Sequence, residues 1–157
     1  MKNKLVLVIL GLLTYSSVIT QIIKPDRWSS KVSKDNPKQG EIIDLIFTVK
    51  LEDTWHLYSN IQNYDIGPKP TEFKFVPNNS YKLIGDIIPI NTRKEYDEVF
   101  EVDINYFENT AEFRQKIKII SKDPIIKGTY EYQVCTTIDG KCILGDDEFV
   151  FKIETTK

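Results

Sequence analysis

The chain contains two cysteines, Cys135 and Cys142, and only six residues separate them near the C-terminal end. In an oxidising compartment a pair this close can form a disulfide that serves as an inert staple. The same disulfide can instead exchange with the thiols of another protein and carry electrons. Which of these two applies is the central question about the function of the chain.

The N-terminal segment predicts that the chain is exported. Basic residues Lys2 and Lys4 precede an apolar run from Leu5 to Leu13, and small and polar residues follow as far as Gln21. This is the order of a secretory signal peptide, and the apolar run is shorter than the roughly 20 residues that span a bilayer. We therefore expect residues 1–20 to be a signal peptide and residues 21–157 to form a single periplasmic domain with no stable membrane insertion.

The charge balance argues against nucleic acid as a partner. The chain has 21 basic and 23 acidic residues, and without residues 1–20 the balance is 19 to 23, a net charge of −4. Nucleic acids and anionic membranes attract basic surfaces. We therefore expect neither of them to be bound.

Other chemistry-bearing residues are few. His56 is the only histidine. With the two distant cysteines it could in principle bind zinc or copper, but an oxidised pair supplies no thiolate ligand. A hydrolytic triad would need the same histidine, and nothing marks a nucleophile for it. We expect no metal and no other cofactor.

Alternation of apolar and polar residues dominates the exported part of the chain. Leu45, Phe47 and Val49 fall on one face and polar Asp44 and Thr48 on the other, and turn residues such as those at 67–70 interrupt the pattern. No ten-residue window after the N-terminal segment has a convincing helical period. The sequence predicts an all-β fold, an immunoglobulin-like antiparallel β-sandwich. Its strands are expected at residues 41–51, 55–59, 72–76, 81–88, 96–104, 111–119, 129–135 and 148–154.

The strand expected at residues 129–135 positions the first cysteine. Tyr130, Tyr132 and Val134 share one face, which we assign to the core. Because successive side chains of a strand point to opposite faces, Cys135 lies on the other face at the end of the strand.

A turn between the two cysteines can bring them together. Asp139-Gly140 is a strong turn signal, so the chain can fold back and return Cys142 beside Cys135 at a distance that permits a disulfide. Closing so short a loop contributes roughly 2–3 kcal/mol, which a domain of this length does not need in order to fold. Spacing and compartment alone still favour a structural staple.

The residues around the pair resemble a known family. Tyr132-Gln133-Val134-Cys135, followed by Gly140-Lys141-Cys142, is similar to the active-site hairpin of the N-terminal periplasmic domain of the thiol:disulfide interchange protein DsbD. Further segments occur in the family's order, as in stand-alone relatives of the Bacteroidetes type. They are Gly40-Glu41, Trp55-His56-Leu57-Tyr58-Ser59, residues 67–73, residues 96–101 and Tyr106-Phe107, and the last two resemble the family's cap-loop region. The likeness covers roughly residues 28–154.

The resemblance implies roles for particular residues. Cys135 and Cys142 are then the redox pair, with Cys142 as the attacking thiol and Cys135 as the resolving thiol. Tyr106 and Phe107 are candidates for an aromatic cap over the pair, and Tyr58 is a candidate lining residue. The spacing departs from the best-known members, in which five residues rather than six separate the cysteines.

The resemblance also implies partners and an activity. The chain would be a component of a thiol-disulfide oxidoreductase system. Thioredoxin-like proteins and a membrane electron-transfer protein would supply electrons, and periplasmic thiol proteins would receive them. The alternative is an exported immunoglobulin-like binding or adhesion module with an inert structural disulfide.

Overall fold

Ten β-strands make up the fold in the computed structural model, which describes residues 23–98 and 100–156. The expected signal peptide lies outside the described residues. No helix occurs within these ranges, and therefore none there that could cross a membrane. The strands are β1 (Asp26–Val32), β2 (Ile42–Leu51), β3 (Trp55–Tyr58), β4 (Glu72–Phe75), β5 (Tyr81–Ile90), β6 (Arg93–Asp97), β7 (Val102–Glu108), β8 (Thr110–Ile119), β9 (Ile125–Thr136) and β10 (Cys142–Lys152).

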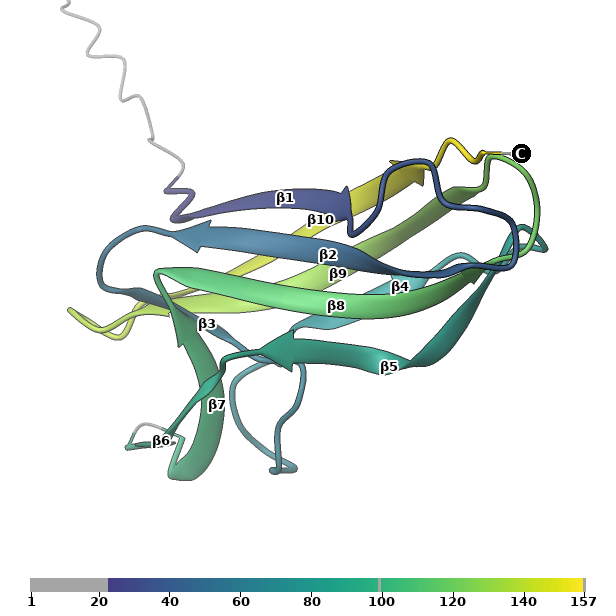
Figure 1. Cartoon of the computed structure of the whole chain (residues 1–157). Coiled ribbons are helices and arrows are strands. Elements are labelled where there is room, and N and C mark those ends of the chain that lie inside the picture. Colours follow the sequence, from purple (N-terminus) through teal and green to yellow (C-terminus); the bar gives the residue numbers. More distant parts are fainter. Residues whose placement is uncertain (1–22, 99, 157) are drawn as a thin grey trace, which may run out of the picture.

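The strands form two antiparallel sheets that pack face to face (Figure 1). The four-stranded sheet has the order β1-β2-β8-β5, and the other sheet has the order β10-β9-β3-β7-β6, with β4 added beside β9. This confirms the predicted immunoglobulin-like β-sandwich. The alternation in the sequence was sufficient for this assignment because each sheet buries one face and leaves the other in water.

Aromatic side chains fill the space between the sheets. Phe47 of β2 and Phe113 of β8 are opposed in the register and almost fully buried. The Phe47 ring lies 4.8 Å from that of Phe73 on β4 and 5.0 Å from that of Phe149 on β10. These contacts join strands of both sheets, so the core closes around the apolar face that the sequence pattern indicated.

One predicted strand is two strands in the structure. Residues 96–104 were expected to run straight, but they contain the end of β6, a turn and the start of β7. In that turn the Phe100 amide donates to Oδ1 of Asp97 at 3.0 Å, and Glu101 has a φ of 57°. An Asp side chain that accepts a nearby backbone amide competes with strand pairing, which explains why the prediction was wrong here.

The first strand was not predicted at all. Most side chains of β1 are exposed or half-buried, so its sequence has no clear alternation. Trp28 attaches the strand to the core, because its ring stacks on Tyr130 with centroids 4.1 Å apart. A single buried aromatic residue of this kind leaves no periodic signal in the sequence.

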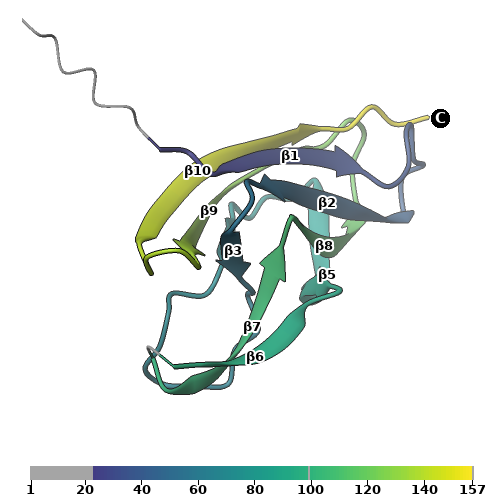
Figure 2. The same cartoon turned by 90° about the vertical axis from the view of Figure 1, so that its left-hand side faces the viewer.

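Strand β9 is the centre of the second sheet. It pairs with β10 along its length on one side. On the other side it pairs first with β4, through residues 128–131, and then with β3, through residues 134–136. The β9–β10 hairpin and the β6–β7 hairpin therefore lie at the same end of the molecule (Figures 1 and 2).

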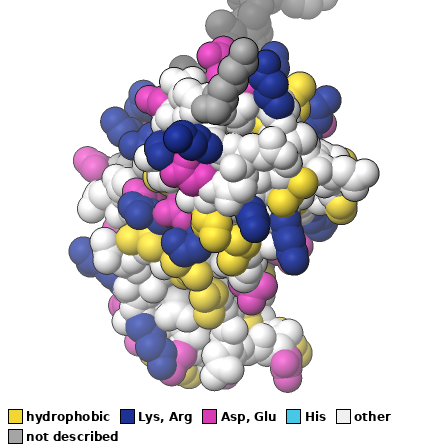
Figure 3. Space-filling view, turned by 45° about the vertical axis from the view of Figure 1, so that its right-hand side comes forward, with side chains coloured by type: hydrophobic (Ala, Val, Ile, Leu, Met, Phe, Trp, Pro, Cys, Tyr) yellow, Lys and Arg dark blue, Asp and Glu magenta, His cyan; other side chains and the backbone are white. Residues whose placement is uncertain are grey.

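The face turned away from this end is an ordinary mixed surface. Figure 3 shows basic and acidic side chains interspersed around a band of hydrophobic side chains, and no histidine is visible there. Lys116 and Asp44 form one of the ion pairs on the four-stranded sheet, at 3.2 Å. Exposed pairs of this kind contribute little to stability.

A buried hydrogen bond connects the first strand to β9. The Tyr132 hydroxyl donates to Oδ2 of Asp26 at 2.5 Å, and both side chains are buried. Burial raises the pKa of Tyr132 above its ordinary value, and the bond to Asp26 adds to this effect. Tyr132 therefore stays protonated and remains a donor to the carboxylate.

Substituting Tyr132→Phe should lower the free energy of unfolding by about 1.5–3 kcal/mol, because it leaves a buried carboxylate without its donor. Urea unfolding monitored by circular dichroism measures this loss. The matched control is Tyr81→Phe, whose hydroxyl donates to a neutral acceptor, the Val76 carbonyl, at 2.7 Å. A loss no larger for Tyr132→Phe than for the control would contradict the prediction.

Candidate functional site

The β9–β10 hairpin joins the two cysteines. Cys135 and Cys142 are opposed in the register, their Cα atoms are 4.1 Å apart, and a disulfide connects them. Beyond the pair, the Thr136 amide donates to the Lys141 carbonyl at 2.9 Å. The chain therefore folds back between the cysteines as the Asp-Gly signal predicted.

The loop between the cysteines depends on Gly140. This residue has a φ of +67°, a left-handed conformation that glycine adopts without strain. Its amide donates to the Thr136 carbonyl at 3.2 Å. The side chain of Asp139 accepts the Lys141 amide at 3.1 Å, so the loop is closed by its own hydrogen bonds.

The two sulfurs are not equivalent. Cys135 is 3% exposed, whereas Cys142 is an exposed residue at the start of β10. An approaching thiolate must reach the sulfur that it attacks. The geometry therefore favours attack on Cys142, with Cys135 as the sulfur that leaves.

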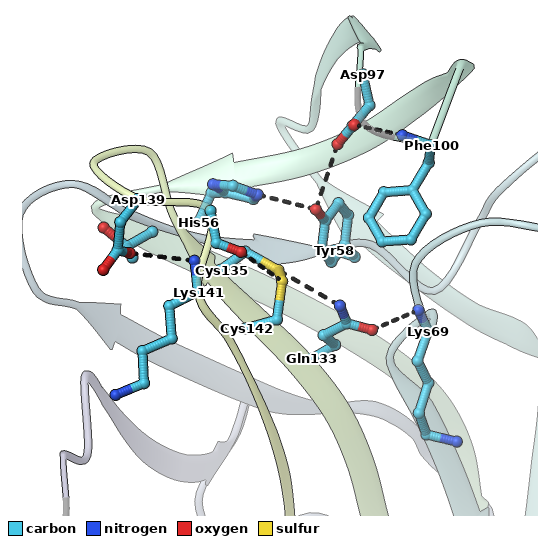
Figure 4. The surroundings of a disulfide bond; sticks show 12 residues. His56, Tyr58, Lys69, Asp97, Phe100, Gln133, Cys135, Asp139, Lys141 and Cys142 are labelled. Atoms are coloured by element: carbon cyan, nitrogen blue, oxygen red, sulfur yellow. Dashed lines mark hydrogen bonds between the residues drawn. A yellow bond between two sulfur atoms is a disulfide. The ribbon is translucent and has the colours of Figure 1, made fainter.

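A hollow of about 330 Å³ lies beside the disulfide. His56 and Tyr58 of β3, Asp97 at the end of β6, and Phe100 form its walls (Figure 4). The two cysteines and residues 136, 137 and 140 complete the lining. Four separate segments of the chain therefore meet at one end of β9.

A chain of hydrogen bonds crosses this hollow. The Tyr58 hydroxyl donates to Oδ2 of Asp97 at 3.4 Å, and Nε2 of His56 lies 3.1 Å from the same hydroxyl (Figure 4). Burial raises the pKa of Tyr58 far above its ordinary value, and Asp97 adds to the shift. Burial lowers the pKa of His56 below its ordinary value, while the carboxylates of Asp97, Glu108 and Glu95 act in the opposite direction.

Gln133 fixes the buried sulfur from its own strand. Its Nε2 donates to Sγ of Cys135 at 3.4 Å, and its Oε1 accepts the Lys69 amide at 2.8 Å. Gln133 and Cys135 are two residues apart on β9, so they share a face of the strand. The side chain therefore connects the buried sulfur to the segment that precedes β4.

The turn before β3 holds the hairpin loop from the other side. The Thr54 carbonyl accepts the Thr137 amide at 2.9 Å, and the hydroxyls of Thr54 and Thr136 are 3.3 Å apart. Thr54 has a φ of 71°, which is strained for a β-branched residue. The hairpin end is thus fastened to a turn that adopts an unfavourable conformation to meet it.

The structure brings two of the three predicted aromatic residues to the pair. Tyr58 and Tyr106 belong to the small buried cluster that contains Cys135. The Tyr106 hydroxyl donates to Glu95 at 2.7 Å. Phe107 faces the opposite way: it is 2% exposed in the main core, with its ring 5.2 Å from Phe113. Adjacent residues of β7 point to opposite faces, so the expectation that both would cover the disulfide is wrong for Phe107.

Sequence reasoning missed other residues of the site. Phe100 was hidden because residues 96–104 were read as one strand. His56 and Gln133 carried a usable signal, since each shares a strand face with a predicted site residue: His56 is two residues from Tyr58, and Gln133 is two residues from Cys135. Asp97 lies in the segment 96–101 that resembles the family's cap-loop region, but no strand pattern marked it, because a turn brings it to the hollow.

Fold and site together define a class of protein: a β-sandwich domain that exchanges thiols and disulfides through a cysteine pair at a hairpin end. The sequence matches the family model of the N-terminal domain of thiol:disulfide interchange protein DsbD over residues 20–153, and the chain belongs to this family. The search of curated protein sequences gave no significant match.

Two solved domains share the fold, and a solved complex is also similar to the chain. The N-terminal domain of Neisseria meningitidis DsbD in the reduced form has 17% identity and a TM-score of 0.51, over 75% of this chain and 82% of that one. The N-terminal periplasmic domain of ScsB from Proteus mirabilis has 14% identity and a TM-score of 0.52, over 81% of this chain and 45% of that one. A complex between the DsbD and PilB N-terminal domains from Neisseria meningitidis has 12% identity and a TM-score of 0.49, over 82% of this chain and 89% of that one.

Substituting Gly140→Ala should make the disulfide easier to open. A Cβ at this position meets no atom within 4 Å, so the cost is the left-handed backbone alone, about 1 kcal/mol. Reduction frees the loop to release this strain, so we expect the equilibrium constant for oxidation against glutathione to fall about fivefold.

Gly85→Ala is the matched control. Gly85 has a φ of +65° and equally open surroundings, but it lies in β5. The Gly85→Ala variant should lower the free energy of unfolding by about 1 kcal/mol, the same backbone cost as at Gly140. It should leave the equilibrium with glutathione unchanged. Equal effects of both variants on that equilibrium would show that the Gly140 loop does not control the disulfide.

Proposed function

We propose that this chain is an exported redox relay that passes electron pairs through Cys135 and Cys142. Thioredoxin-like proteins, which receive electrons from a membrane electron-transfer protein, reduce the pair. The reduced pair then reduces periplasmic thiol proteins. The observation that carries this proposal is the asymmetry of the disulfide, with Cys142 exposed and Cys135 buried beside a hollow that His56, Tyr58 and Asp97 line with a chain of hydrogen bonds. An inert staple has no need of such an environment.

The proposed exchange proceeds in two steps. A donor thiolate attacks the Cys142 sulfur, forms a mixed disulfide and expels Cys135 as a thiolate. A second donor thiolate then attacks the donor sulfur of the mixed disulfide and releases Cys142. Two electrons enter the domain, and the donor leaves oxidised. The same steps in reverse transfer the pair of electrons to an acceptor disulfide.

Access to the disulfide is the second part of the proposal. Phe100 lines the hollow from the β6–β7 connection, next to Tyr58 and above the cysteines (Figure 4). It occupies the place in which a cap residue was expected from Tyr106 and Phe107. We assign the cap to Phe100 and the wall of the hollow to Tyr58. Tyr106 packs in the same buried cluster as Tyr58 and Cys135. A partner that displaces the β6–β7 connection then reacts faster than a small thiol.

Residues 21–157 are proposed to be the mature domain, which acts in the periplasm after removal of residues 1–20. The family match from residue 20 supports this boundary.

The Cys135→Ser variant should accumulate a mixed disulfide with an oxidised thioredoxin-like protein, because Cys142 attacks the disulfide of that protein while the resolving thiol Cys135 is missing. Non-reducing electrophoresis and mass spectrometry of the adduct measure this outcome. The matched control is Cys142→Ser, which should form little adduct because Cys135 is buried. Adduct formation through Cys135 alone would contradict the assigned roles.

A redox titration of the wild-type domain tests the relay itself. A relay disulfide should have a potential within the range of thioredoxin-like proteins, about −120 to −270 mV, whereas a structural staple lies below about −300 mV. If a reduced thioredoxin-like protein left the disulfide intact over minutes, the relay proposal would be wrong and the binding-module alternative would be supported.

Substituting Phe100→Ala should speed the reduction of the disulfide by glutathione. An aromatic contact of about 1 kcal/mol that must be displaced slows access about fivefold, so we expect an increase of about that factor. Stopped-flow fluorescence or quenched time points give the rate. The matched control is Phe75→Ala, which also replaces a phenylalanine by alanine. Phe75 lies opposite Gly128, at the end of the β4–β9 pairing that is far from the disulfide. An unchanged rate in Phe100→Ala would remove the cap from the proposal.

A further inference from the structure

His56 is the nearest titratable side chain to the buried sulfur in the register of the sheet. It is the cross-strand partner of Cys135 in the β3–β9 pairing. Directly opposed side chains lie on the same face with Cβ atoms about 4.5–5.5 Å apart. Both residues also line the same hollow. The relay steps given above assign His56 no role, although it lies beside the sulfur that must gain and lose a proton.

The hydrogen-bond chain sets the tautomer of this histidine. Because the Tyr58 hydroxyl donates its proton to Asp97, its oxygen accepts from His56. Nε2 of His56 therefore carries the proton in the neutral ring, and Nδ1 keeps its lone pair. An oriented base of this kind, held by a hydroxyl that is held by a carboxylate, is the arrangement that activates nucleophiles in proteins.

The charges around His56 suit a group that accepts a proton at neutral pH. Burial lowers its pKa, so the ring is neutral before reaction. Carboxylates nearby stabilise the imidazolium once it forms. The titratable and charged groups that face it are Tyr58 on its own strand, Tyr106 and Glu108 on β7, Glu95 and Asp97 on β6, Glu98 after β6, and Arg93, which pairs with Glu108 at 2.6 Å.

The buried position of Cys135 creates the need for such a group. The resolving thiol must be a thiolate when it attacks, and burial in an apolar site raises the pKa of a thiol. Tyr58, Tyr106 and Ile104 surround Cys135 in its cluster. Without a proton acceptor in the hollow, Cys135 would be protonated and slow at neutral pH.

We propose that His56 takes the proton from the Cys135 thiol when the disulfide closes, releases it to solvent, and supplies a proton from solvent to the Cys135 thiolate when the disulfide opens. On closing, the proton moves from Sγ of Cys135 to Nδ1 of His56, directly or through one water in the hollow. The Cys135 thiolate then bonds to the Cys142 sulfur, and the partner sulfur of the mixed disulfide leaves with the bonding electron pair. On opening, the Cys135 thiolate is expelled, the neutral His56 ring takes a proton from solvent, and the imidazolium formed in this way protonates the thiolate. This inference rests on the proposed relay function.

The closing step can be observed by itself. The reduced domain is mixed with the aromatic disulfide dithionitrobenzoate, which releases coloured thionitrobenzoate. The first equivalent reports attack by Cys142, and the second reports closure by Cys135 on the mixed disulfide. The rate of the second phase is measured by stopped flow from weakly acidic to alkaline pH in the wild type, in His56→Gln and in Tyr58→Phe.

In the wild type we expect the second-phase rate to rise with pH through a titration below about 6.5, the ordinary pKa of histidine. It should then level off before the cysteine range. In His56→Gln this low-pH rise should vanish and the rate should climb only near the ordinary thiol pKa, about 8.5. Because each unit of thiol pKa changes the thiolate fraction about tenfold, the variant should close at least about tenfold more slowly at neutral pH.

Tyr58→Phe removes the link between His56 and Asp97 and should move the low-pH rise without abolishing it. The matched control is Tyr81→Phe, which also removes one buried hydroxyl but lies outside the site. Its two phases should match the wild type.

A wild-type second phase with no titration below pH 8 would overturn the proposal, whether or not the variants fold. The proposal would also be overturned if the second-phase rate of His56→Gln depended on pH in the same way as that of the wild type, with the circular dichroism spectrum of the variant unchanged. Failure of the relay is recognised separately, because a domain that forms no adduct with thioredoxin-like proteins still yields both phases with the small reagent.

Discussion

The alternation of side chains along β9 is the constraint on which the rest of the structure depends. Tyr130, Tyr132 and Val134 point into the sandwich, where they are buried among the aromatic side chains of both sheets. Because the period of a strand is two, Gln133 and Cys135 must point the other way. A shift of one residue would exchange the two sets, so the packing of the core also determines where the disulfide lies.

The asymmetry of the disulfide follows from the neighbours of β9. Its final residues are covered on one side by β3, which places His56 beside Cys135, while Cys142 begins β10 at the edge of the sheet. The sulfur of Cys135 therefore lies beside the hollow, and Cys142 is exposed to solvent. Access and proton transfer become separate tasks, each handled by different residues. The first belongs to the β6–β7 connection, and the second belongs to the strand face of β3.

The sequence predicted those parts of the molecule that repeat. Period-two alternation was sufficient for the sandwich, for the inward face of β9 and for the hairpin that joins the cysteines. It failed where a single interaction decides the backbone. The carboxylate of Asp97 accepts an amide and turns the chain between β6 and β7, which brings Phe100 to the hollow and leaves Phe107 in the core. No periodic pattern reveals such a turn. The resemblance of residues 96–101 to a cap loop therefore did not single out Phe100, and Tyr106 and Phe107 were predicted as the cap.

The core and the site are built on opposite faces of the same strand, and this separation has a physical consequence. The main cluster of buried side chains and the small cluster around Cys135 share no residue. The hollow is enclosed by hydrogen bonds from three connecting segments, at Thr54, Lys69 and Asp97, and those contribute little to the aromatic packing between the sheets. The side chains of the hollow can therefore be tuned for exchange while the sandwich retains its stability, since the burial that stabilises the fold lies elsewhere.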